Sequence, residues 1–197
     1  LATFNSNITS DNIHSICVDS RNNLWVGTYY GGLFMKRSGS NEFRRFVADG
    51  SPRNPLTTNN IYTVFQDSRG NLWVGTQYGG LYRYDYSRGR LERFVHESLN
   101  HSFVWDIHED RAGDIWIACY GGGIWRLSSA ENHSPLKIET PARNFVTLCE
   151  LRDGRILAGT EKEGLVAINP LTLEVEWINK STGLPDKTVY GILQDDN

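Results

Sequence analysis

The sequence predicts an all-β protein built from repeated antiparallel units. One block occurs twice almost unchanged, as NNLWVGTYYGGL at residues 22–33 and as GNLWVGTQYGGL at 70–81. Two looser copies follow at 113–124 and 154–165, and a short block rich in apolar residues precedes each copy. The composition agrees, because 19 glycines against 6 prolines, with 12% aromatic residues, suit short strands joined by tight turns.

The period of the repeat predicts the architecture. Trp25, Trp73, Trp116 and Leu157 hold the same place in the four copies and lie 48, 43 and 41 residues apart. A period in the forties that contains several short strands is the length of one β-propeller blade. We therefore expect a single propeller fragment over residues 1–197, with four complete blades and a partial blade at each end. The expected repeats are 12–59, 60–102, 103–143, 144–187 and a partial repeat at 188–197.

Alternation and turn residues place four antiparallel strands in each repeat, as the second repeat illustrates. Its strands are expected at 60–67, 72–76, 80–85 and 90–95, with turns that carry Gly or Asn. The inner strands are apolar on both faces, which predicts that neighbouring blades cover them. Trp73 and Gly75 point to the same side of a strand, so the Trp-x-Gly pattern is interpreted as packing in which the glycine admits the next blade.

Composition excludes several classes of function. A formal net charge of -3 gives no sign of the basic surface that nucleic-acid binding requires, so no nucleic-acid partner is expected. No apolar run reaches the roughly 20 residues that a membrane helix needs. The 3 cysteines form no zinc-binding pattern, and neither a metal nor a cofactor is expected. Because the sequence begins with Leu1, we expect a processed or excised piece, with any leader or anchor outside it.

The repeated motif resembles that of the two-component regulator propeller family. The residues that carry the resemblance are the strand-one Asp, the GNLWVGTxxGGL block and the YRYD that follows at 82–85. The third copy departs from the motif at Ala118 and Cys119, and the fourth departs at Leu157. The segment from Thr182 to Leu193 also looks like the start of a blade in that family. A WD-repeat protein is disfavoured, because no Trp-Asp pair closes the third strand.

The resemblance implies a function for the longer protein. Members are commonly extracytoplasmic sensor regions of bacterial hybrid histidine kinases, with about seven blades, and many respond to oligosaccharides. It implies further blades, a membrane helix, a periplasmic sensor on an inner-membrane protein, and a homodimer of the full-length receptor. The kinase chemistry would lie outside this chain, so the fragment is expected to be no enzyme and to contain no catalytic residue.

A ligand site is expected on one rim of the blades. The loop between strands two and three and the loop before strand one share that rim, and aromatic, amide and charged side chains gather there. Aromatic faces beside hydrogen-bonding groups suit a sugar, which has an apolar face and a ring of hydroxyls. The alternative is that these tyrosines pack on neighbouring blades and the asparagines shape turns. The candidate residues are Tyr29, Tyr30, Gln77, Tyr78, Tyr120, Tyr62, Trp105, Arg143 and Asn144.

Two other functions stay open. A propeller lyase or hydrolase would need His, Glu or Asp in the channel, but the 5 histidines occupy non-equivalent places in the repeats. The aspartates that recur at the turn after strand one, where a carboxylate is expected to cap backbone N–H groups, are Asp19, Asp67, Asp110 and Asp195. A scaffold that presents propeller faces to other proteins is the second alternative.

Overall fold

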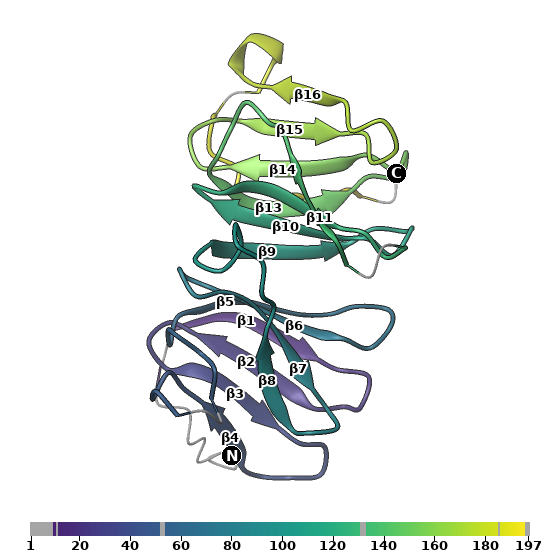
Figure 1. Ribbon diagram of the computed structural model, residues 1–197. Helices are drawn as coiled ribbons and strands as arrows, with labels where there is room; N and C mark the ends of the chain where they lie inside the picture. Colours follow the sequence, from purple (N-terminus) through teal and green to yellow (C-terminus); the bar gives the residue numbers. More distant parts are fainter. Residues whose placement is uncertain (1–9, 11, 52–53, 131–132, 185, 196–197) are drawn as a thin grey trace. The chain divides into compact units, whose positions relative to one another are not determined.

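The structure is a computed structural model that describes residues 10, 12–51, 54–130, 133–184 and 186–195. Within them, sixteen strands form four separate sheets of four antiparallel strands each (Figure 1). The predicted all-β fold with four complete four-stranded units is therefore confirmed. The chain divides into two compact units, one up to residue 101 and one from residue 102, and each is described by itself.

The first unit holds blades 1 and 2. Each sheet runs in chain order from its first strand to its fourth, so every neighbouring pair is a hairpin. Blade 1 consists of β1 (Ile13–Val18), β2 (Leu24–Thr28), β3 (Gly32–Lys36) and β4 (Phe43–Phe46). Blade 2 consists of β5 (Ile61–Gln66), β6 (Leu72–Thr76), β7 (Gly80–Asp85) and β8 (Arg90–Arg93). β6 and β7 have the predicted bounds, whereas β8 ends two residues earlier than expected.

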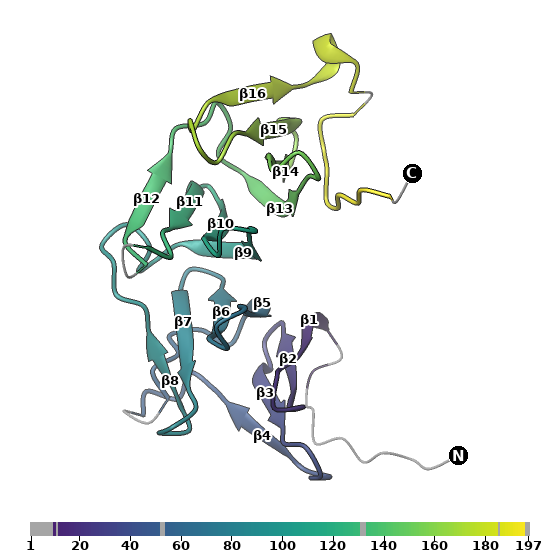
Figure 2. The same ribbon diagram turned by 90° about the vertical axis from the view of Figure 1, so that its right-hand side faces the viewer.

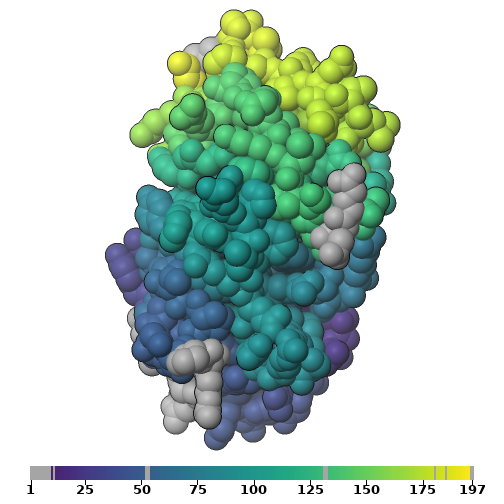
Figure 3. Space-filling view, viewed as in Figure 1, coloured from purple at the N-terminus to yellow at the C-terminus, as the bar shows by residue number. Residues whose placement is uncertain are grey.

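The second unit holds blades 3 and 4, which have the same strand order. Blade 3 consists of β9 (Phe103–Glu109), β10 (Ile115–Tyr120), β11 (Gly123–Leu127) and β12 (Pro135–Ile138). Blade 4 consists of β13 (Phe145–Glu150), β14 (Ile156–Thr160), β15 (Leu165–Ile168) and β16 (Val175–Ile178), followed by a short 3-10 turn. Figure 2 shows these strands side by side in order. β16 and the segment after it lie at the surface of this unit (Figure 3, green to yellow).

The centre of blades 1, 2 and 3 is a fully buried tryptophan on the second strand, and its indole N–H donates to the recurrent aspartate. The other oxygen of that aspartate accepts backbone N–H groups of the turn between strands one and two. The predicted capping role is confirmed for Asp19, Asp67 and Asp110, and the bond to tryptophan adds a second role. The pairs are Trp25 with Asp19 (2.8 Å), Trp73 with Asp67 (2.9 Å) and Trp116 with Asp110 (2.7 Å).

Neighbouring blades of one unit meet along their second and first strands. In the first unit, a Cβ added to Gly27 would lie 2.8 Å from Cγ2 of Ile61, so glycine is required for this close approach. Ile61 is fully buried against blade 1, whereas the equivalent Ile13 of β1 is 47% exposed. Polar bonds join the same strands, because Ser15 Oγ accepts the Val64 N–H at 2.9 Å. The prediction that a glycine admits the next blade is confirmed at Gly27.

The expected partial blades are only partly described. Residues 188–195 form no strand. Their contacts with blade 4 nevertheless match those of a first strand. The Val189 carbonyl approaches Gly159 as Ile61 approaches Gly27, and Gln194 Oε1 accepts the Arg152 N–H at 2.8 Å as Gln66 accepts that of Ser20. The N-terminal partial blade, expected near residues 3 and 4, lies outside the described residues.

Candidate ligand-binding rim

The loop between the second and third strands of each blade is held by a short hydrogen-bonded turn. In blades 1, 2 and 4 the threonine that ends the second strand donates its hydroxyl to the carbonyl of the glycine four residues later. Two residues after the threonine position the backbone is left-handed, with φ between 58° and 76°. The residues in that conformation are Tyr30, Tyr78, Gly121 and Lys162.

A left-handed conformation is costly for any residue with a Cβ, by about 1–2 kcal/mol. The loops nevertheless hold Tyr30 and Tyr78 in it, and their side chains are 69% and 63% exposed. Backbone strain combined with an exposed aromatic side chain is a feature of ligand-binding loops. These two tyrosines are therefore the strongest candidates among the predicted residues.

The predicted meeting of two loop classes on one rim is visible within single blades. The Tyr29 N–H donates to the Asn12 carbonyl at 2.9 Å, and the Gln77 N–H donates to the Asn60 carbonyl at 3.0 Å. Blade 4 repeats the bond between Glu161 and Asn144 at 3.0 Å. The loop before strand one and the loop after strand two thus lie side by side in these blades.

In the first unit, four rings gather into what we call the first-unit aromatic cluster: His14, Tyr29, Tyr30 and Tyr62. Ring centroids lie 4.0 Å apart for Tyr29 and Tyr30, and 4.4 Å apart for His14 and Tyr62. The Tyr29 and Tyr30 hydroxyls lie 3.3 Å apart. Burial lowers the pKa of His14 and raises the pKa of Tyr62, so both rings favour their uncharged forms.

The amides of the first unit connect this cluster to blade 2. Asn60 Oδ1 accepts the Tyr30 N–H at 2.9 Å, and Asn60 Nδ2 donates to Gln77 Oε1 at 2.6 Å. The carbonyl of the predicted ligand residue Gln77 is thus already used within the protein. Tyr78 follows Gln77 on the same loop. Tyr30 and Tyr78 therefore offer exposed rings beside a fixed pair of amides.

In the second unit, Phe103, Trp105 and Tyr120 form what we call the second-unit aromatic cluster. Their ring centroids lie 5.0 to 5.8 Å apart. A hydrogen bond from the Tyr120 hydroxyl lowers the pKa of Glu161. Trp105 lies inside β9 and is half-buried. The nine predicted residues thus fall into two groups, and the second unit holds Trp105, Tyr120, Arg143 and Asn144.

Arg143 and Asn144 precede β13 and have different roles. The Asn144 side chain accepts the Gly121 N–H at 3.1 Å, which joins blade 4 to the rim loop of blade 3. The backbone N–H groups of both residues donate to Glu163 Oε2 at 3.1 Å. The Arg143 side chain is exposed. Asn144 shapes the rim, therefore, and Arg143 is the more accessible of the two.

Sequence reasoning missed Asp106, a partly buried acid on β9. Its carboxylate accepts the Ile107 N–H at 2.9 Å and, from the next blade, the Leu148 N–H at 2.8 Å. Burial raises the pKa of Asp106 to about 6, although the two hydrogen bonds oppose this. The signal that could have found it is its repeat position, which in blade 1 is held by Ser15.

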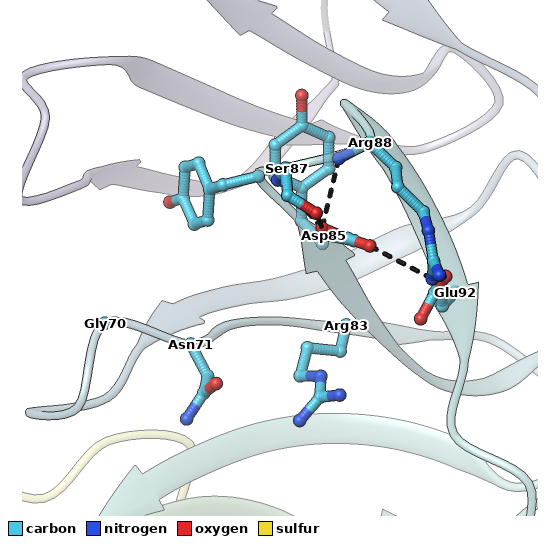
Figure 4. Close-up of a pocket in the computed structure, with 9 residues that line it drawn as sticks. Gly70, Asn71, Arg83, Asp85, Ser87, Arg88 and Glu92 are labelled. Carbon is cyan, nitrogen blue, oxygen red and sulfur yellow. Dashed lines mark hydrogen bonds and ion pairs between the residues drawn. The ribbon is translucent and has the colours of Figure 1, made fainter.

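A polar hollow of about 400 Å³ lies beside the hairpin turns of blade 2, away from the rim loops (Figure 4). Asp85 accepts the backbone N–H groups of Ser87 and Arg88, and Arg88 pairs with Glu92 at 2.9 Å. Arg83 also lines it. Most of its charges are already paired, which makes it a weaker candidate than the rim.

Among the described residues, no three His, Cys, Asp or Glu side chains are grouped so that they could hold a metal ion. No helix in the same part of the chain is long and apolar enough to cross a membrane.

Repeated four-stranded blades that meet through a Trp-x-Gly strand define a β-propeller. The model of a protein family described as "Two component regulator propeller" matches three repeats of the chain, at residues 7–30, 55–78 and 98–121. The resemblance expected from the motif is thus confirmed. No curated protein matches the chain at a significant level.

Solved structures resemble the chain over most of its length. The extracellular domain of the hybrid two component system BT4673 from B. thetaiotaomicron is 25% identical, with a TM-score of 0.77 over 94% of this chain and 25% of that one. The corresponding domain of BT3049 from the same organism is 21% identical, with a TM-score of 0.71 over 87% of this chain and 24% of that one. The chain thus spans about a quarter of these domains.

A third structure resembles the chain in fold alone. Virginiamycin B lyase from Staphylococcus aureus is 13% identical, with a TM-score of 0.65 over 84% of this chain and 55% of that one.

Proposed function

We propose that this chain is the ligand-sensing propeller segment of a bacterial hybrid two-component histidine kinase, and that it recognises an oligosaccharide in the periplasm. The observation that carries the proposal is the pair of exposed tyrosines, Tyr30 and Tyr78, in left-handed loops. The family match and the likeness to extracellular domains of two component systems support the sensor role.

The chemistry of the rim supports a neutral polyhydroxylated ligand. Tyrosine rings present apolar faces on which the C–H face of a pyranose can stack. Hydroxyl and amide groups beside them, as at Tyr29 and Asn60, can exchange hydrogen bonds with sugar hydroxyls. The uncharged state favoured at His14 and Tyr62 suits a ligand without charge.

The rest of the receptor would supply what this segment lacks. The remaining blades would complete the propeller, to about seven in all, and the kinase and membrane parts would lie elsewhere in an inner-membrane protein. The full-length receptor would act as a homodimer, and this segment would bind without catalysing a reaction. No specific observation favours the scaffold or the lyase alternative, because the likeness to the lyase concerns fold alone.

The test replaces Tyr30 and Tyr78 with glycine in the intact protein. Glycine adopts φ > 0 freely, as Gly121 does in blade 3, so the fold is kept or slightly stabilised. Loss of two stacking rings, each worth about 1 kcal/mol, lowers affinity by roughly tenfold or more. The ligand is first found by a thermal-shift screen of defined oligosaccharides, and the dissociation constant is then measured by calorimetry.

A matched control separates binding from strain. Asn22 has φ 58° in the turn between β1 and β2, where blade 2 has Gly70. Asn22→Gly therefore relieves the same kind of strain away from the rim loops and should leave affinity unchanged. Equal affinity in the double tyrosine variant and the wild type would refute the rim site.

A further inference from the structure

One position on the outer strand of each blade has a recurrent role. This position pairs with a residue of strand three that lies two places after the glycine that starts that strand or, in blade 4, directly precedes it. The partners on strand three are Phe34, Tyr82, Trp125 and Val166. Three blades have a cationic residue at this position, and blade 4 has an aromatic one. The residues are Arg45, Arg93, Lys137 and Trp177.

In blades 1, 2 and 4 the side chain at this position donates to the rim loop. Arg45 Nε donates to the Gly31 carbonyl at 2.8 Å, and Arg93 Nη2 donates to the Gly79 carbonyl at 3.2 Å. Trp177 Nε1 donates to the equivalent carbonyl, that of Glu163, at 2.8 Å. The indole thus keeps the bond between outer strand and loop that arginine makes elsewhere.

The hydrogen bond explains where the indole N–H of Trp177 lies, but it does not explain why the rest of the ring is exposed. Trp25, Trp73 and Trp116 are fully buried in the cores of their blades, whereas Trp177 is 44% exposed. An arginine would make the same bond without leaving a large apolar ring in water. An exposed indole fixed by its N–H is a rigid stacking surface.

Trp177 also lines a cavity of about 450 Å³, which is large enough for a sugar unit. The cavity is lined by residues of blade 4 and of the segment that follows β16. Its lining combines the indole with amide, hydroxyl and charged groups. The lining residues are Lys162, Glu163, Trp177, Asn179, Ser181 and Lys187.

The charged residues that line this cavity are two lysines and one glutamate. Glu163 Oε2 accepts two backbone N–H groups, those of Arg143 and Asn144, so this carboxylate is held by the protein's own backbone. Lys162 lies 3.6 Å from Glu161 in an ion pair at an exposed position, which contributes little. Lys187 makes no ion pair with any described residue. Two lysines against one glutamate leave the lining with a formal charge of +1 beside an aromatic face, and Lys187 is the cation that no described ion pair uses.

We propose that the Trp177 cavity binds an acidic sugar, a pyranose ring that carries a carboxylate or sulfate group. The apolar face of the ring stacks on Trp177, and the acidic group lies between Lys162 and Lys187. This site belongs to blade 4 alone and goes beyond the rim site, because it requires neither aromatic cluster.

The decisive variant is Trp177→Arg in the intact protein. Arginine restores the residue found in blades 1 and 2, so the bond to the loop and the fold should be retained. The probes are an oligosaccharide of galacturonic acid and the galactose oligosaccharide of the same linkage and length. We expect the variant to bind the acidic probe at least tenfold more weakly in calorimetry. If charge alone were responsible, the added cation would strengthen binding, so unchanged or tighter binding would overturn the proposal.

A second variant tests the charge. Lys187→Gln should remove most of the preference for the acidic probe over the neutral one, and the preference of the wild type should decline as salt rises. Equal preference in Lys187→Gln and the wild type would count against the site. The Tyr30→Gly, Tyr78→Gly double variant should bind the acidic probe as the wild type does. If it loses that binding while Trp177→Arg keeps it, the rim explains recognition and the cavity does not.

Discussion

The first and the second unit build the same kind of blade from different side chains. Both blades of the first unit combine the Asp–Trp bond with the threonine turn, whereas each blade of the second unit lacks one of these features. Blade 3 keeps the bond but has Cys119 in place of the threonine, and blade 4 keeps Thr160 but has Leu151 and Leu157 in place of the pair.

In blade 4 the aspartate and the tryptophan are both replaced by leucine, which indicates that each of the two residues depends on the other. A buried carboxylate without its donor, or a buried N–H without its acceptor, carries the full cost of desolvation. Two leucines avoid both costs. The loss of either partner alone is therefore expected to be worse than the exchange of both.

The units also differ in the bond between their first strands. In the first unit Ser15 accepts a backbone N–H from the next blade, and in the second unit Asp106 does so at the equivalent position. A hydroxyl carries no charge, whereas a carboxylate does. The second unit alone should therefore respond to pH through this bond.

The largest effect is expected when the Asp–Trp pair of blade 2 is replaced by two leucines, as in blade 4. Asp67→Leu leaves the Trp73 N–H and the turn N–H groups without their acceptor, and should cost about 3 kcal/mol. Trp73→Leu creates a cavity and should cost about 3 kcal/mol as well. The double variant should cost about 1–2 kcal/mol less than the sum of the two, as measured by urea unfolding.

Strict additivity would show that Asp67 and Trp73 contribute independently, contrary to this interpretation. Ser68→Ala, in the turn between β5 and β6 but outside the Asp–Trp bond, serves as the surface control. It should shift stability by no more than about 0.5 kcal/mol.

The next effect concerns Asp106 and pH. Its folded pKa of about 6 lies above the 3.8 of an unperturbed aspartate, so the folded state binds the proton more tightly. The stabilisation this provides is fully present below about pH 4 and is lost as the pH rises to about 6. A difference of that size corresponds to roughly 2–3 kcal/mol.

The variant Asp106→Ser adopts the residue of blade 1 and should abolish this dependence. Stability measured from pH 4 to 7 should then be flatter than in the wild type, with the greatest gain near pH 7. Ser15→Ala is the control, because it removes the equivalent uncharged bond and should lower stability by a similar amount at every pH. A wild-type profile with no decline between pH 4 and 6 would contradict the assignment.

The smallest effect is expected at Cys119. The side chain is fully buried, and burial raises the pKa of its thiol to about 12. Iodoacetamide at pH 8 should therefore modify Cys17 and Cys149, which are partly exposed, and spare Cys119, as mass spectrometry of peptides can show. Cys119→Thr restores the residue of the other three blades and should stabilise the protein by about 0.5–1 kcal/mol through a bond to the Gly123 carbonyl. Rapid modification of Cys119 in the folded protein would contradict its burial.

Much of the fold could be predicted because the information is local. The alternation in residues 72–76 and 80–85 defines two strands, and a turn with glycine lies at each end. The sequence predicted that a strand of the next blade would approach the glycine of the Trp-x-Gly pattern, because a glycine beside a large indole leaves room for another strand. It did not predict which residue would approach Gly27. The chemical partner of the indole was missed, since the aspartate was interpreted only as a turn cap.

The candidate site was less predictable. The rim position of Tyr30 and Tyr78 follows from the strand order, but their left-handed backbone is unusual for tyrosine and had no signal in the sequence. Trp177 could have been found by aligning the fourth strands, where it replaces arginine or lysine. Fourth strands are short and weakly patterned, however, so their register is clear only once the sheet is formed.

The sequence by itself determined the repeat, the strand order and the family resemblance, because these depend on periodicity, on turn residues and on a motif within one blade. Only the tertiary structure decided that Asp106 accepts a hydrogen bond from the next blade and that Trp177 is exposed beside a cavity. Burial and exposure depend on which surface of a neighbouring strand or loop reaches a side chain, and that is set by packing between segments far apart in the chain.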